Sequence, residues 1–270
     1  MPELPEVETT RRGIEPFLLG QTILTLCVRE PRLRWPVPPE LRQELSGRAI
    51  QTVSRRGKYL LIGVASGSVI MHLGMSGSLS IVSASIPAGK FDHIDIILTN
   101  GDCLRLRDPR RFGSVLWSVN PAQHALLRHL GPEPLENDFS GNYLFNQSRG
   151  RIRAVRDFIM DSHIVAGIGN IYANEALFLA GIDPRRRAGK ISRQRYDRLA
   201  QTIRVTLEDA LAAGGTTLRD FRRSDGTPGY FQQSLKVYGR KDRPCPQCAR
   251  PIRGQMLGSR SAFFCISCQN

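Results

Sequence analysis

The sequence predicts an α+β protein whose strands, helices and cysteines occupy successive parts of the chain. Short alternating segments with glycine-rich turns fill residues 22–118, and one helical pattern that ends near Gly20 precedes them. Helical periodicity returns over residues 150–222, and four of the six cysteines follow residue 244. Strands grouped before helices are typical of α+β folds, and so many short strands favour a β-sandwich or a barrel for the first part.

The first helix and one hairpin are the clearest elements. Apolar residues between positions 7 and 18 recur on one helical face, and Gly20 is a suitable stop. In residues 94–98 and 104–106 apolar side chains alternate with others. Asn100-Gly101 between them is typical of a two-residue turn, so we expect an antiparallel hairpin there.

Proline and glycine punctuate residues 130–142, which predicts a domain boundary. Beyond it, a long helix is expected to begin after Ser192, a suitable N-cap, and to end at Gly214-Gly215. The predicted domains are a β-domain over 1–132, a helical domain over 133–236 and a cysteine hairpin over 237–270.

Basic residues outnumber acidic ones along the whole chain. Lys and Arg number 38 against 24 Asp and Glu, which gives a formal net charge of +14 and a pI near 10.2. Because this excess is not confined to a tail, it indicates a folded surface that meets a polyanion, with nucleic acid the leading candidate. No run of about 18 apolar residues predicts a membrane span, and the acidic N-terminus lacks the features of a signal peptide. We therefore expect a cytosolic protein.

The cysteine spacing predicts one structural zinc ion. Two C-x-x-C pairs separated by 16 residues fit a four-thiolate site, in which each pair places two sulfurs on one side of a tight turn. With four protein ligands there is no open coordination position for water, so the metal would have a structural and not a catalytic role. The predicted ligands are Cys245, Cys248, Cys265 and Cys268. The hairpin between the pairs would present Arg260 at its tip, where a nucleic-acid contact is expected. Cys27 and Cys103 stand in apolar surroundings and are expected to fill the core.

Three carboxylates crowd the opening stretch MPELPEVE around Pro2. One explanation is that acids favour a helix N-terminus through the macrodipole. That explanation covers acids in general, but not a Pro-Glu pair directly after Met1. Glu6 follows Glu3 by three residues and would share its side of a helix, whereas Glu8 is expected to be solvated.

Eight motifs, in order, resemble those of the bacterial formamidopyrimidine-DNA glycosylases, which remove oxidised purines from DNA. They are PELPEVET, RRGKYLL, HLGMSGSL, DPRRFG, GIGNIYANEAL, SDGTPGYF, VYGRKDRPCPQC and the closing C-x-x-C. The resemblance covers nearly the whole chain. It implies an N-terminal β-sandwich preceded by a helix, a helical domain with a helix–two-turn–helix motif, and a C-terminal zinc hairpin. It also implies a monomeric cytoplasmic enzyme that acts on double-stranded DNA.

By this resemblance Pro2, exposed when Met1 is removed, is the nucleophile. An α-amino group has a reference pKa of roughly 8, so a useful fraction is neutral at physiological pH. Attack on the sugar C1′ would expel the base and leave a cationic iminium, which draws electrons as the strand is cut by β,δ-elimination. Glu3 would transfer the protons. Lys58 and Arg260 complete the catalytic set that the resemblance implies.

The resemblance also implies a DNA-binding set. A base removed from a duplex must first be flipped out, and the void must be filled. Met75, Arg110 and Phe112 resemble the void-filling residues of the family, whereas without the motifs Met75 and Phe112 would pass for core residues. Phosphate contacts are implied for Lys58, His72, Asn170, Tyr238 and Arg260, and further DNA contacts for Glu6, His93, Arg153 and Arg156. The loop at 224–231 resembles a lid over the flipped base.

Two other functions fit part of the pattern. Endonuclease VIII, which prefers oxidised pyrimidines, shares the terminal proline and the zinc hairpin, but the void-filling set and the 224–231 loop argue against it. A non-catalytic zinc-containing DNA-binding protein would need no Pro2-Glu3 pair. Arg156, where a lysine is expected, and Ser162, where an amide is usual, depart from the family pattern. They bear on the expected lesion preference and, at Arg156, on the phosphate contact that the resemblance implies.

Overall fold

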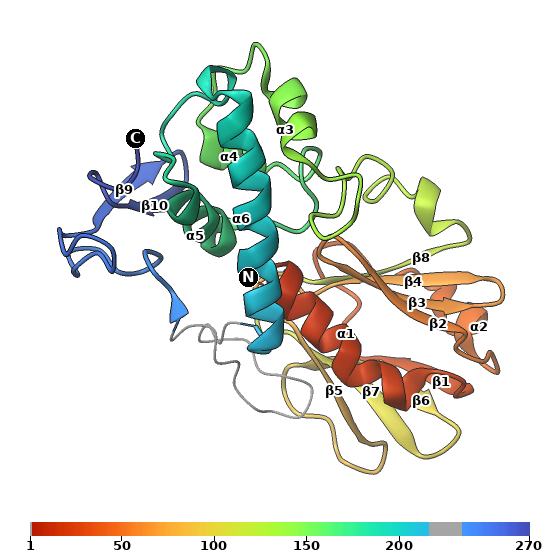
Figure 1. Cartoon of the computed structure of the whole chain (residues 1–270). Coiled ribbons are helices and arrows are strands. Elements are labelled where there is room, and N and C mark those ends of the chain that lie inside the picture. Colours follow the sequence, from red (N-terminus) through yellow and green to blue (C-terminus); the bar gives the residue numbers. More distant parts are fainter. Residues whose placement is uncertain (1, 216–233) are drawn as a thin grey trace. The chain divides into compact units, whose positions relative to one another are not determined.

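A helix and two antiparallel sheets form the first part of the chain in the computed structural model, which describes residues 2–215 and 234–270 (Figure 1). The described residues divide into two compact units, one of residues 2–128 with 213–215 and one of 129–212 with 234–270. The three-domain division stays a prediction. No described helix has both the length and the apolar character that crossing a bilayer requires.

The first unit is a β-sandwich preceded by helix α1 (Leu4–Leu18), as predicted. Each sheet has four strands, paired in antiparallel fashion among the described residues. One runs in the order β1 (Ile23–Val28), β6 (Asp92–Leu98), β7 (Asp102–Arg107), β5 (Ser78–Ser83). The other runs in the order β2 (Thr52–Arg56), β3 (Tyr59–Val64), β4 (Gly67–His72), β8 (Ser114–Ser118).

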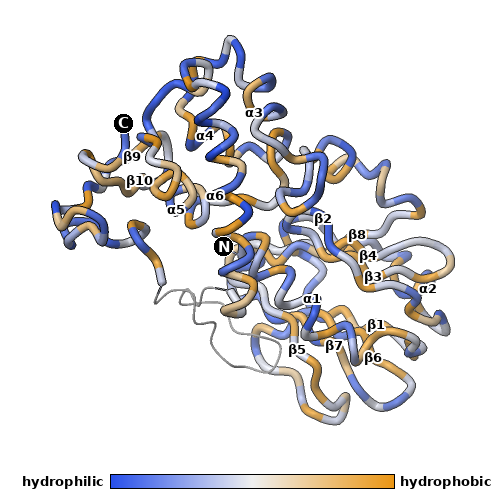
Figure 2. Tube along the Cα trace, viewed as in Figure 1, coloured by the Kyte–Doolittle hydropathy of each residue, from blue (hydrophilic) through white to orange (hydrophobic). Residues whose placement is uncertain are grey.

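Apolar side chains from both sheets and from α1 meet in one buried cluster. Ile96 and Leu104 of one sheet, Ile62 of the other and Ile14 of the helix all belong to it. Figure 2 shows the hydrophobic residues that recur along β1, β6 and β7. Alternation along each strand therefore places one face of each sheet in a shared core.

The predicted hairpin is present, but its turn has three residues and not two. Strands β6 and β7 pair with Ile97 opposite Cys103, and the N–H of Gly101 donates to the Leu98 carbonyl at 3.2 Å. Gly101 has φ of 90°, whereas Asn100 is not in the left-handed region. Both common two-residue hairpin turns, types I′ and II′, need positive φ at the first central position, here Asn100. The chain instead forms a type I turn followed by a left-handed glycine. The short helix α2 (Leu41–Leu45) and the 3₁₀ turn η1 (Pro121–Gln123) were not predicted.

The second unit is helical and ends in the cysteine hairpin. Its elements are α3 (Gly141–Ser148), α4 (Val155–Ile159), α5 (Asn170–Ala180), η2 (Ala188–Lys190), α6 (Arg193–Ala212), β9 (Arg253–Leu257) and β10 (Arg260–Phe264). Helix α6 follows the prediction: Ser192 Oγ accepts the Arg195 N–H at 3.4 Å, and Gly214 with φ of 73° follows the helix end.

Helix α5 is the central helix of this unit. Almost every residue between Ile171 and Ala180 is buried, polar ones included. A helix that is buried on all sides must satisfy its polar side chains inside the protein. Those side chains hold the candidate site residues that lie in this unit.

Candidate active site

The start of α1 carries two buried carboxylates beside the buried Pro2. Glu3 caps the helix, and its side chain accepts the backbone N–H of Glu6. In return, Glu6 Oε2 accepts the Glu3 N–H at 2.9 Å, which completes a capping box. Because that N–H belongs to the peptide bond after Pro2, the Glu6 carboxylate also holds Pro2 in place.

Glu8 is joined to arginines and is not solvated as expected. Its carboxylate bonds two arginines of α1 and Arg55 of β2 at 2.8–3.2 Å. Burial acts to raise the pKa of Glu8, but these hydrogen bonds and charges outweigh it and hold the pKa below its ordinary value. The Arg55 guanidinium also donates to the Gly57 carbonyl at 2.8 Å. Glu8 therefore ties α1 to the turn that carries Lys58.

His72, at the end of β4, is a neutral histidine with a defined tautomer. Burial, together with the positive charges of Lys58 and Arg34, lowers the pKa of His72 to about 4. Its ring centroid lies 4.9 Å from that of Tyr59, and its Nδ1 accepts the Gly74 N–H at 2.9 Å. Since Nδ1 is an acceptor, the proton resides on Nε2, where it can be donated to a phosphate oxygen.

Met75 and Phe112 lie on two loops of the first unit and are not core residues. Their side chains are 39% and 45% exposed. The guanidinium carbon of Arg110 lies 4.7 Å from the centroid of the Phe112 ring. His93 is buried, with Nε2 2.8 Å from the Asp108 carbonyl oxygen. The two loops thus present exposed apolar side chains beside a cation.

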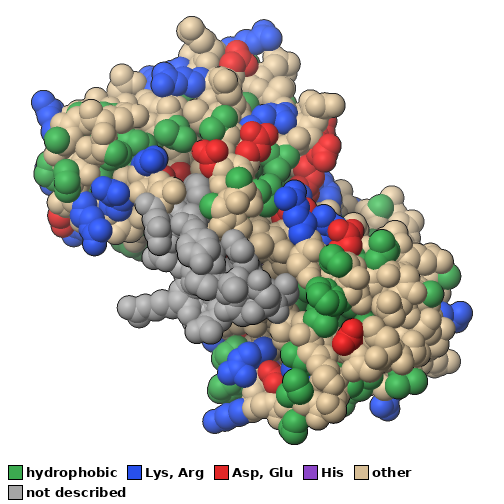
Figure 3. Space-filling model, turned by 60° about the horizontal axis from the view of Figure 1, so that its bottom comes forward, with side chains coloured by type: hydrophobic (Ala, Val, Ile, Leu, Met, Phe, Trp, Pro, Cys, Tyr) green, Lys and Arg blue, Asp and Glu red, His purple; other side chains and the backbone are tan. Residues whose placement is uncertain are grey.

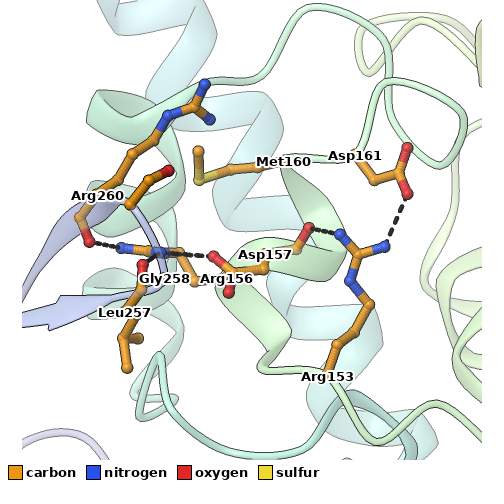
Figure 4. Close-up of a pocket in the computed structure, with 9 residues that line it drawn as sticks. Arg153, Arg156, Asp157, Met160, Asp161, Leu257, Gly258 and Arg260 are labelled. Carbon is orange, nitrogen blue, oxygen red and sulfur yellow. Dashed lines mark hydrogen bonds and ion pairs between the residues drawn. The ribbon is translucent and has the colours of Figure 1, made fainter.

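A hollow of about 300 Å³ lies between α4 and the turn of the β9–β10 hairpin in the second unit (Figure 4). Arg153, Arg156 and Arg260 all line it. Arg153 donates to Asp161 Oδ2 and to the Asp157 carbonyl, both at 2.7 Å. Arg260 is exposed at the end of the turn. The sequence-predicted arginines of this unit therefore gather at one place.

Arg156 is buried, and its guanidinium bonds acceptors on both α4 and the hairpin. It donates to the carbonyls of Leu257 at 2.8 Å and Arg260 at 3.0 Å, which lie at the two ends of the hairpin turn. It also donates twice to Asp157 Oδ1, at 3.0 and 2.6 Å. In this conformation Arg156 clips the hairpin tip to α4.

Two asparagines of α5 hold the other side of the hairpin. Asn170 Nδ2 donates to the Ser261 carbonyl at 2.9 Å, and Asn174 Oδ1 accepts the Phe263 N–H at 2.7 Å. Asn174 Nδ2 in turn donates to the Asn170 carbonyl at 2.6 Å. Asn170 therefore sits at the N-terminus of α5, a position that favours anions, while its side chain supports β10.

Glu175 of α5 fixes the backbone that leads to Tyr238. Its carboxylate accepts the N–H groups of Lys236, Val237 and Tyr238 at 2.8–2.9 Å. Burial raises the pKa of Glu175 in spite of these hydrogen bonds. The Tyr238 ring packs edge-on against Phe263, with centroids 5.2 Å apart.

The four cysteines form a cluster that can hold a metal ion. Their Sγ atoms all lie within 4.8 Å of one another, with Cys245 to Cys268 at 3.9 Å and Cys248 to Cys265 at 3.5 Å. A tetrahedron with metal–sulfur bonds of about 2.3 Å has sulfur–sulfur edges of about 3.8 Å. The geometry fits a four-thiolate centre.

Comparison with known proteins decides the family. The model of the formamidopyrimidine-DNA glycosylase N-terminal domain matches residues 1–115, and that of the formamidopyrimidine-DNA glycosylase H2TH domain matches residues 130–222. The chain belongs to the formamidopyrimidine-DNA glycosylase family. Curated members from Nitrosococcus oceani and Stutzerimonas stutzeri are 59% and 58% identical to it, with full coverage of both chains.

Solved structures of the family share the fold. The MutM (Fpg) protein of Thermus thermophilus matches with a TM-score of 0.89 and 37% identity, over 99% of this chain and 98% of that one. The Lactococcus lactis Fpg in complex with DNA that contains an abasic site matches with a TM-score of 0.91 and 32% identity, over 99% of both chains. The helix–two-turn–helix domain expected from the sequence is the one that the second family model describes, and the four-cysteine hairpin follows it in the chain.

The sequence-predicted residues divide between the two units. The first holds Pro2, Glu3, Glu6, Lys58, His72, Met75, His93, Arg110 and Phe112, and the second holds Arg153, Arg156, Asn170, Tyr238, Arg260 and the cysteines. The predicted lid at 224–231 lies outside the described residues. Sequence reasoning missed the supporting residues Asp108, Asn174 and Glu175. Among these supporting contacts, only the capping box between Glu3 and Glu6 had a local signal in the sequence, namely the spacing of three residues.

Proposed function

We propose that this chain is a base-excision repair enzyme, a bifunctional DNA glycosylase and abasic-site lyase that removes 8-oxoguanine and formamidopyrimidines. The observation that carries the proposal is the Pro2-Glu3 pair at the capped start of α1, in a chain that belongs to the formamidopyrimidine-DNA glycosylases. The complex of its L. lactis relative with abasic-site DNA supports DNA as the substrate.

Loss of Met1 leaves Pro2 with a secondary amine. Its nitrogen lone pair attacks C1′ as the bond from C1′ to the base breaks. The base leaves with the bonding electrons and takes up one proton, and the alkylated Pro2 nitrogen gives up its N–H proton, so the step is balanced. Glu3 protonates the opening sugar ring, which turns the C1′ adduct into an iminium. The Glu3 carboxylate, which has given up its proton, then takes the C2′ proton, and the electron pair of that C–H bond expels the 3′ phosphate as the C3′–O bond breaks. A second elimination, with loss of the C4′ proton to a base, expels the 5′ phosphate as the C5′–O bond breaks. Lys58 and Arg260 donate hydrogen bonds to the departing phosphates and offset their negative charge.

The side chains that hold the DNA match the demands of a flipped nucleotide. Met75, Arg110 and Phe112 fill the space that the base vacates, which suits their exposure and the cation over the ring. His72 donates to phosphate from Nε2. Lys and Arg side chains occur at several separate places on the face shown in Figure 3, consistent with a backbone grip over a wide area.

The metal of the cysteine cluster is proposed to be zinc. Four thiolates at tetrahedral spacing are the donor set that zinc prefers, and no coordination position is left for water. The metal would hold the hairpin that carries Arg260. A monomeric state and a cytoplasmic location remain predictions that accompany this function.

A second activity, removal of oxidised pyrimidines in the manner of endonuclease VIII, is less well supported. The paired loops of Met75 and Phe112 and the names of the relatives favour oxidised purines. A non-catalytic DNA-binding role leaves the capped Pro2-Glu3 pair without a purpose.

The decisive experiment blocks the Pro2 amine. A protein with an uncleaved N-terminal tag should bind an 8-oxoguanine duplex but neither release the base nor cut the strand, because an amide nitrogen has no basic lone pair. A protein with the same tag at the C-terminus and a native Pro2 terminus is the control. In the control, borohydride should trap a covalent adduct that peptide mapping places on Pro2.

Glu3→Gln should bind the duplex and lose base release, since an amide cannot donate and recover the proton. If the N-terminally tagged protein is fully active, the nucleophile lies elsewhere, and Lys58 is the next candidate. If the control binds the duplex without any cleavage, the non-catalytic role is correct. If it cuts only oxidised pyrimidines, the second activity is correct.

A further inference from the structure

One buried carboxylate joins the two loops that carry Met75 and Phe112. Asp108 is 0% exposed. Its Oδ1 accepts a hydrogen bond from Ser76 Oγ at 2.7 Å, and its Oδ2 accepts the Gly113 N–H at 2.7 Å. Ser76 directly follows Met75, and Gly113 directly follows Phe112. One oxygen of this carboxylate therefore holds the residue next to Met75, and the other holds the residue next to Phe112.

Further hydrogen bonds extend the junction to Arg110 and His93. Ser76 Oγ accepts the backbone N–H of Arg110 at 3.3 Å. The Asp108 carbonyl oxygen accepts His93 Nε2–H at 2.8 Å. Breaking a hydrogen bond between buried groups leaves a donor or an acceptor without its partner, which is costly.

The loop backbones touch, so they have little freedom to move separately. A Cβ on Gly74 would lie 2.3 Å from the carbonyl carbon of Phe112, and one on Gly113 would lie 2.8 Å from the His72 carbonyl oxygen. Gly74 also has φ of 61°, which suits glycine. Only glycine permits this close approach.

We propose that Ser76 and Asp108 are positioning residues that make the two loops a single wedge, so that Met75, Arg110 and Phe112 enter the duplex together. This rests on the proposed function. Filling the void with three side chains costs less conformational entropy when their relative positions are already set. Neither Ser76 nor Asp108 need touch DNA.

The test deletes one hydroxyl. Ser76→Ala separates the Met75 loop from Asp108 and should slow release of 8-oxoguanine from a duplex about tenfold in single-turnover assays. Cleavage of the same duplex with a preformed abasic site should change less than twofold, because no base is extruded. Ser83→Ala is the matched control: it removes an exposed hydroxyl bond of β5 in the same unit and should affect neither substrate.

Two further measurements separate positioning from fold stability. In a Phe112→Ala background, Ser76→Ala should slow 8-oxoguanine release little further. Without the Phe112 side chain, holding the Met75 loop in line with the Phe112 loop no longer brings an advantage. Asp108→Asn keeps the side-chain shape but cannot accept both donors, and it should show the same preference for abasic DNA. Wild-type melting temperatures in both variants would exclude partial unfolding.

Equal losses on both substrates, or additive losses with Phe112→Ala, would mean that the Ser76–Asp108 contact serves the fold only. These outcomes differ from failure of the proposed function, in which the wild-type protein itself would release no 8-oxoguanine.

Discussion

Replacing Arg156 with methionine should release the tip of the β9–β10 hairpin. Methionine fills a similar volume but cannot donate to the Leu257 and Arg260 carbonyls, which Arg156 bonds at 2.8 and 3.0 Å. Because these carbonyls lie at the two ends of the turn, the loss frees the segment that carries Arg260. Under the proposed function, Arg260 would then spend less time in the position from which it would contact phosphate.

The size of the effect follows from the two bonds. Hydrogen bonds from a charged donor are worth about 1.5–3 kcal/mol each. Part of this is offset because methionine is easier to bury than a guanidinium. A net loss of about 3 kcal/mol raises the opening equilibrium of the turn by about two orders of magnitude.

Amide hydrogen exchange of residues 253–264 measures this opening directly. Exchange should quicken in Arg156→Met, and the slope of log DNA affinity against log salt should fall by about 0.9, one phosphate contact. Arg260→Ala should lower the slope equally, and the double variant should match it. Arg204→Met, which removes bonds to the carbonyls of Glu136 and Phe139, is the control and should leave the hairpin unchanged.

Unchanged amide exchange across the hairpin in Arg156→Met would show that Arg156 does not hold the hairpin turn against α4. Additive losses of salt slope in the double variant would show that Arg156 does not act through Arg260. It would then contact phosphate itself, as the family resemblance implies.

Three other predictions concern separate parts of the chain. Cys248→Ser should weaken the affinity for DNA without lowering the stability of the first unit. Elemental analysis should find one zinc ion per wild-type chain, and active protein without zinc would refute the metal assignment. Phe112→Ala should slow 8-oxoguanine release but spare abasic-site cleavage, and equal loss on both would make Phe112 structural. The pKa of His72 is lowered to about 4 in the folded chain, below the reference of about 6.5, because burial and the charges of Lys58 and Arg34 disfavour the cation. His72 therefore favours the fold above about pH 6.5, and this stability is lost as pH falls towards 4. Denaturant unfolding between pH 7 and 4 should show a smaller loss for His72→Gln than for wild type; identical pH profiles would mean that His72 does not contribute.

Several elements were predictable because their signals are local. The cysteine pairs bring four sulfurs within 4.8 Å of one another, since each tight turn aims two of them the same way. Ser192 and Gly214 bound α6 because caps act on their own helix end. Alternation in β6 and β7 predicted their pairing, but not the three-residue turn, because backbone dihedrals at Asn100-Gly101 depend on how the sheet twists.

Contacts between distant residues were decided by the tertiary structure alone. Asp108 meets Ser76 across 32 positions, Glu175 meets Tyr238 across 63, and Arg156 meets the Arg260 carbonyl across 104. No local pattern marks these side chains, because each bonds a backbone group or hydroxyl that comes near only when the sheets and helices have packed. The sequence by itself therefore determined the family and the cysteine cluster, and it predicted a set of DNA-contacting residues. The tertiary structure decided which buried polar groups hold those residues in place, since a buried donor or acceptor must find whichever partner the fold brings to it.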